Sequence, residues 1–150
     1  MTPSEDELRD EERYFLQWRQ TKSRLSDIDP ELRDLIVDLN EAGYYTQACC
    51  QGRKTLAEFK RFKRSRSHSP RAYIFFWRPI SRLRIIEATE AGLNVYGDNL
   101  GILSTPVKPE YKHSFFFPNE LRESIHKKTK LILVEANQQF VDRVRKIWLE

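Results

Sequence analysis

Residues 44–53 have the sequence YYTQACCQGR, and we interpret them as a strand that ends in a turn. Tyrosine and threonine suit a pleated, half-buried surface. Side-chain alternation would place Tyr44, Thr46, Ala48 and Cys50 on one face, and Tyr45, Gln47 and Cys49 on the other. Gln51-Gly52-Arg53 has the composition of a turn. The stretch therefore predicts a strand that is followed by a turn with a glycine and an arginine.

The segments on either side of this strand predict the core. Asp29-Pro30-Glu31 suits an N-cap, a first-turn proline and a first-turn acid. Leucine and isoleucine residues then recur at helical spacing over residues 30–42, and Gly43 suits the helix end. Residues 72–77 (AYIFFW) are bounded by prolines and predict a buried strand. We expect the helix to pack onto that strand through Leu32, Leu35, Ile36 and Leu39.

The remaining segments complete a prediction of one α+β domain over residues 1–150. Capping and periodicity favour helices at residues 5–22 and 81–91, and a short helix in the first half of residues 54–71. Strand candidates lie at residues 93–104, around a Gly97-Asp98-Asn99 turn, and at 111–117. The C-terminus fits one long helix or two shorter ones, although residues 130–134 (KLILV) could instead form a strand. We predict a small, mostly antiparallel sheet covered on one face by N-terminal helices and a long helical C-terminus.

Composition excludes several classes of protein. With 150 residues and 12% aromatic residues, the chain predicts a folded domain rather than a disordered one. No apolar run approaches the roughly 18 residues that a membrane span needs. The start, MTPSEDELRDEER, is acidic, which argues against a secretory signal. The two cysteines are adjacent and indicate no disulfide framework, so we expect a cytoplasmic protein.

Charge is distributed unevenly along the chain. Residues 1–50 contain six Lys/Arg and twelve Asp/Glu, whereas residues 51–80 contain nine Lys/Arg and one Asp/Glu. Such an asymmetry indicates either a nucleic-acid or phosphate contact or a basic segment that faces an acidic one within the fold.

The turn after the first strand is the first candidate site. Backbone N–H groups in such a turn can form a concavity that binds an anion, and an arginine can add a bidentate contact. We expect Arg53 to follow the strand rather than to pack within it. The alternative is an ordinary strand-to-loop corner. The candidate ligand-binding residues are Thr46, Cys50, Gln51, Gly52 and Arg53.

The basic segment that follows, residues 54–71, is the second candidate, and we expect residues 60–71 to form a mobile basic loop. Basic side chains neutralise phosphates, and exposed aromatic rings such as Phe59 and Phe62 can stack on bases. The alternative is a solvated loop whose phenylalanines pack into the core. The candidate phosphate-binding residues are Lys54, Lys60, Arg61, Lys63, Arg64, Arg66 and Arg71, in addition to Arg53.

Residues 39–53 (LNEAGYYTQACCQGR) resemble the signature of the wybutosine-synthesis methyltransferases that modify tRNA. Thr46, Cys50, Gly52 and Arg53 match the family's spacing, while Gln47, Ala48, Cys49 and Gln51 depart from it. A looser resemblance is to small bacterial and phage proteins in which a histidine stands at the position of Arg53. The two resemblances together cover about residues 32–77. The first implies binding of S-adenosylmethionine and methyl transfer to a modified guanosine.

These observations lead to three function hypotheses. The leading one is a phosphate-recognising protein that binds a nucleic acid or nucleotide without covalent chemistry, and the phage likeness suggests a role in host–phage conflict. The second is an S-adenosylmethionine-dependent RNA methyltransferase, and the third is a protein–protein adaptor. We expect no cofactor outside the methyltransferase hypothesis, and an inert Cys50. We expect no metal site, because Cys49, Cys50, His68, His113 and His126 lack ligand spacing.

Overall fold

The computed structural model describes residues 9, 12–13, 16, 18–19, 25, 28–61, 71–105 and 127–150. Their helices are α2 (Pro30–Glu41), α3 (Leu56–Arg61), α4 (Arg82–Glu90) and α6 (Lys127–Trp148). Their strands are β1 (Thr46–Cys50), β2 (Tyr73–Phe76), β3 (Asn94–Tyr96) and β4 (Ile102–Ser104). The strands pair antiparallel in the order β1-β2-β4-β3, which confirms the predicted α+β fold.

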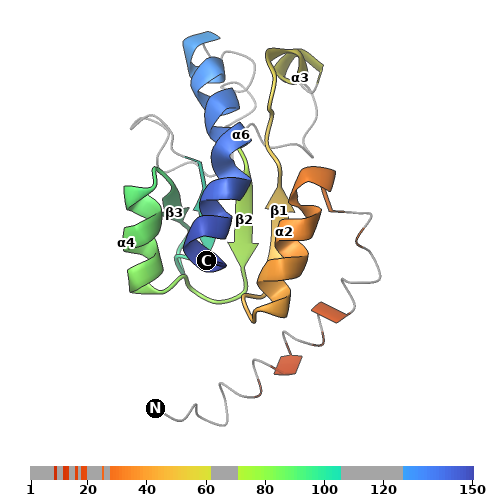
Figure 1. Cartoon of the computed structure of the whole chain (residues 1–150), viewed down its shortest axis with the longest axis vertical. Coiled ribbons are helices and arrows are strands. Elements are labelled where there is room, and N and C mark those ends of the chain that lie inside the picture. Colours follow the sequence, from red (N-terminus) through yellow and green to blue (C-terminus); the bar gives the residue numbers. More distant parts are fainter. Residues whose placement is uncertain are drawn as a thin grey trace.

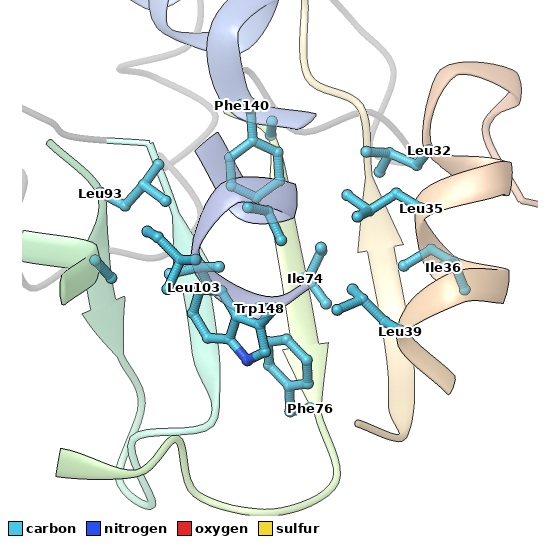
Figure 2. Close-up of a cluster of buried hydrophobic side chains, with 14 of the residues drawn as sticks. Leu32, Leu35, Ile36, Leu39, Ile74, Phe76, Leu93, Leu103, Phe140 and Trp148 are labelled. Atoms are coloured by element: carbon cyan, nitrogen blue, oxygen red, sulfur yellow. The ribbon is translucent and has the colours of Figure 1, made fainter. Parts of the chain in front are cut away.

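Three helices form a layer over one face of this sheet (Figure 1). The long helix α6 lies in the middle, with α2 on the β1 side and α4 on the β3 side. Side chains from β2 and β4, including Ile74, Phe76 and Leu103, meet α6 through Phe140 and Trp148 (Figure 2). The core therefore lies between the sheet and the helix layer.

Helix α2 follows the predicted pattern closely. Its four periodic apolar residues are all buried, and Figure 2 shows them on the side of the helix that faces the sheet and α6. Gly43, at φ +92°, ends the helix, and the Tyr44 amide donates to the Leu39 carbonyl at 2.9 Å. Glycine adopts this left-handed backbone conformation without steric cost, and the chain turns here directly into β1.

We expect Leu35→Ala to lower the free energy of unfolding by about 2–5 kcal/mol, because it removes buried methyl groups and leaves a cavity. Leu35 is fully buried in the core cluster. Urea denaturation measures the change, and Asp34→Ala, at an exposed neighbour, is the control. Equal midpoints for the two variants would contradict the packing of α2.

The structure corrects two details of the sequence interpretation. Residues 130–134 lie within α6, so the strand alternative for KLILV was wrong and the C-terminus forms one continuous helix. The simple alternation along β1 was also wrong, because the register shifts between Thr46 and Ala48. Ala48 and Cys50 oppose Phe75 and Tyr73, whereas Thr46 opposes Phe76 on the helix-covered face.

Some predictions fall outside the described residues. The strand candidate at 111–117 does so entirely, and the helix at 5–22 does so in large part. The residues described there include Trp18, which is helical and joins the buried core. Among the described helices, none has the length and apolar character to cross a membrane.

Candidate functional site

The two ends of the basic segment meet at one end of the sheet. β1 runs toward this end and β2 runs away from it, because the two strands pair antiparallel with Cys50 opposite Tyr73 (Figure 1). Residues Gln51–Lys54 therefore lie beside Arg71 and Ala72. We call these residues the basic end.

Gly52 is packed too closely at the basic end to leave room for any side chain. It has φ +72°, and a Cβ on it would lie 2.4 Å from the Ala72 nitrogen and 2.7 Å from Cγ of Asn137. These approaches are far shorter than van der Waals contact. The glycine therefore allows β1, β2 and α6 to meet.

Asn137 of α6 joins the two strand ends to each other. Its Nδ2 donates to the Arg53 carbonyl at 2.7 Å, and its Oδ1 accepts from the Ala72 amide at 2.8 Å. Sequence analysis missed this residue. A signal was present, since Asn137 is a polar residue on the apolar face of a helix that also carries Leu133, Phe140 and Val144.

The turn amides that were expected to hold an anion donate hydrogen bonds within the protein. The Gln51 amide donates to Oδ2 of Asp29 at 2.9 Å, so a carboxylate of the chain itself occupies the place of the expected anion. The Gly52 amide lies 3.5 Å from the Cys50 sulfur. The turn is therefore held by internal contacts.

The two arginines of the basic end are buried. Arg53 is 1% exposed and Arg71 is 0% exposed, so the expectation that Arg53 lies outside the packed structure was wrong. The Arg71 guanidinium lies 5.2 Å from the centre of the Tyr96 ring, a cation–π contact. Burial lowers the pKa of Arg71, and interaction with Tyr96 opposes that shift. Both arginines thus act as parts of the packed structure.

Lys54 links the basic end to the acidic part of the chain. Its Nζ pairs with Glu31 at the start of α2, and its amide donates to Glu58 at 2.7 Å. Burial lowers the pKa of Lys54, while Glu58 and Asp142 oppose the shift. Part of the charge asymmetry is therefore neutralised within the fold, as the alternative interpretation of the charges predicted.

The other predicted site residues are distributed more widely. Thr46 begins β1 at the opposite end of the strand, where its hydroxyl accepts from Nδ2 of Asn40 at 3.0 Å. Lys60 and Arg61 form the end of α3. Lys63, Arg64 and Arg66, with Phe62, lie outside the described residues. The structure thus brings Cys50, Gln51, Gly52, Arg53, Lys54 and Arg71 together and leaves Thr46 apart.

The adjacent cysteines have the environment of core residues. Cys50 is buried, and burial, with smaller contributions from Asp29 and Cys50, raises the pKa of Cys49 to about 12. Since the thiolate is the reactive form, Cys49 is a poor nucleophile near neutral pH. In the part of the chain that the structure describes, no three potential ligands among His, Cys, Asp and Glu come together as a metal site.

Thr105 is a further residue that sequence analysis did not single out. It follows β4 next to Ser104, whose hydroxyl donates to the Ala72 carbonyl at 2.8 Å. Thr105 is fully buried, and its Oγ1 has no hydrogen-bond partner among the described residues. Through Ser104, Thr105 places a buried hydroxyl beside the basic end.

No protein-family model, no curated protein and no solved structure matches this chain.

Proposed function

We propose that the protein binds nucleic acid through phosphate contacts at the basic end and the segment that leaves it, without covalent chemistry. The observation that carries this proposal is the pairing of β1 with β2, which anchors both ends of a segment with eight Lys/Arg between residues 53 and 71. A strongly basic segment with fixed ends presents its positive charge at one place on the molecule.

The two buried arginines and the other basic residues of the segment would have different roles. Arg53 and Arg71 are enclosed, so we assign them to fixing the segment's ends and to raising the local positive potential. The direct phosphate contacts then fall to the remaining candidates of the segment: Lys60, Arg61, Lys63, Arg64 and Arg66. Each phosphate contact releases counterions, which makes the affinity strongly dependent on salt.

Some of the basic residues that the structure describes form ion pairs within the chain. Lys54 pairs with Glu31, and, at the far end of α6, Arg145 pairs with Asp38 at 2.7 Å. Residues 51–80 nevertheless hold a single acidic residue, Glu58, against nine basic ones. This imbalance supports an external anionic partner.

We expect the double variant Lys63→Glu/Arg64→Glu to bind single-stranded RNA at least about tenfold more weakly than the parent chain, because two phosphate contacts become repulsions. Fluorescence anisotropy with a labelled RNA measures the affinity. The slope of log affinity against log salt should become shallower by about 0.7 for each contact that is lost.

The matched control is Arg82→Glu/Lys146→Glu, which changes net charge equally at two exposed positions in α4 and α6. An equal loss in both variants would mean that only net charge matters. Parental affinity in Lys63→Glu/Arg64→Glu would contradict the proposal. Calorimetry with S-adenosylmethionine tests the rival, because a heat of binding would support the methyltransferase that the resemblance implies.

A further inference from the structure

A cavity of about 480 Å³ lies at the end of the sheet opposite the basic end. It is bounded by the residues just before β1, the loop between β2 and α4, and the last turn of α6. Its volume is within the range of roughly 300–1,000 Å³ that is typical of small-molecule sites. The side chains that decide its chemistry are Tyr44, Tyr45, Trp148, Arg78 and Arg84.

One part of the cavity wall is aromatic and held in place. The Trp148 ring stacks on Phe76 with 5.7 Å between ring centres and 12° between ring planes. Figure 2 shows the pair where β2 ends beside the C-terminal turn of α6. Tyr44 and Tyr45 approach from the start of β1 and are half-buried. Trp148 is only 6% exposed, so the half-buried tyrosines offer most of the aromatic surface against which a flat ring can pack.

The other part of the wall is cationic. The Arg84 guanidinium donates to the Ile147 carbonyl and to the Tyr44 hydroxyl, the latter at 3.4 Å, and lies 3.6 Å from the Glu87 carboxylate. These contacts hold it against the C-terminal turn of α6. Arg78 is exposed and contributes a second positive charge to the lining.

The start of α4 also belongs to the lining. Ser81 is the N-cap, and its hydroxyl accepts from the Arg84 amide at 3.3 Å. The first turn of α4 carries no acidic residue. A negative group beside this turn therefore meets two arginines and the positive end of the helix dipole.

We propose that this cavity binds a mononucleotide, with the base against Trp148 and the tyrosines and the phosphate near Arg78 and Arg84. A lipid chain would need a wholly apolar wall, and a metal ion would need converging carboxylate, histidine or cysteine ligands. A ligand that combines a planar ring with a phosphate uses both parts of the wall. This site is separate from the basic end and does not depend on it.

The sharpest test compares Ser81→Asp with Ser81→Asn. Aspartate and asparagine are both good N-caps, so both variants should keep α4 intact. They differ by one negative charge placed where the phosphate should bind. We expect Ser81→Asn to bind within about threefold of the parent, and Ser81→Asp to bind roughly tenfold more weakly or worse, because like charges repel at close range.

Isothermal titration of the full chain with each of the four nucleoside 5′-monophosphates gives the affinities, and quenching of tryptophan emission gives a second readout. Adenosine and inorganic phosphate, used separately, should each bind more weakly than adenosine monophosphate. The Lys63→Glu/Arg64→Glu variant should bind the mononucleotides like the parent, which keeps this test distinct from the test of RNA binding.

Each adverse result overturns a defined part of the proposal. No binding of any of the four nucleotides at millimolar concentration rejects the site. Equal affinity in Ser81→Asp and Ser81→Asn places the nucleotide elsewhere. If inorganic phosphate binds as tightly as adenosine monophosphate, the base does not contribute to the recognition.

Discussion

Gly52→Ala is expected to lower the free energy of unfolding by about 2–5 kcal/mol, a large fraction of the roughly 5–15 kcal/mol that stabilises a typical domain. For a residue with a Cβ, a left-handed backbone conformation costs about 1–2 kcal/mol. Overpacking adds about 1–3 kcal/mol. The overpacking is severe here, because the new Cβ would meet the Ala72 backbone nitrogen at 2.4 Å. This backbone atom lies directly before β2 and is hydrogen-bonded to Asn137, so it cannot move aside as a flexible side chain can. Urea denaturation followed by circular dichroism measures the loss.

Gly43→Ala is the matched control for this experiment. Gly43 also has positive φ, at +92°, but nothing lies within 4 Å of the position of its Cβ. The control should therefore show the backbone cost of about 1–2 kcal/mol without the steric one. If the two variants lose the same stability, the close contact among β1, β2 and α6 does not exist as described.

Asn137→Leu is expected to cost about 2–6 kcal/mol, because it leaves two buried backbone groups without partners, at about 1–3 kcal/mol each. Those groups are the Arg53 carbonyl and the Ala72 amide. Leucine has the same branching at Cγ as asparagine but is larger, so overpacking adds to the loss of the two hydrogen bonds and no cavity is left. Denaturation midpoints measure the loss in the variant.

Hydrogen exchange adds a local readout for the same variant. The Ala72 amide should exchange much faster in Asn137→Leu than in the parent when both are compared under conditions where they stay folded. Gln139→Leu, on the exposed side of the same helix, should stay within about 0.5 kcal/mol of the parent. A slow Ala72 amide in Asn137→Leu would contradict the bridging role of Asn137.

Together these two predictions concern how the basic segment is anchored. Gly52 permits the close approach and Asn137 supplies the hydrogen bonds, so both strand ends are attached to α6. The proposed binding of nucleic acid requires this anchoring, because it holds the two ends of the positively charged segment at one place.

The local elements of this fold were predictable from the sequence. Residues 30–41 form a helix because apolar side chains recur on one face after a first-turn proline, and residues 73–76 form a strand because β-favouring apolar residues lie between prolines. Both signals are short-range, since they depend on neighbours within one or two turns or on alternating positions. The helical C-terminus shows the same kind of pattern, although residues 130–134 also fitted a strand until the tertiary structure was known.

The contacts that define the candidate sites were decided by the tertiary structure. Asn137 lies 65 and 84 residues along the chain from the two groups that it bonds, and no local pattern encodes such a pairing. The burial of Arg53 and Arg71 likewise depends on what packs around them, not on their neighbours in sequence. The cavity joins Tyr44, Arg84 and Trp148 only because α6 returns across the sheet. Sequence determined the elements through local sterics and periodicity, whereas the sites arise from long-range packing that exists only once the chain has folded.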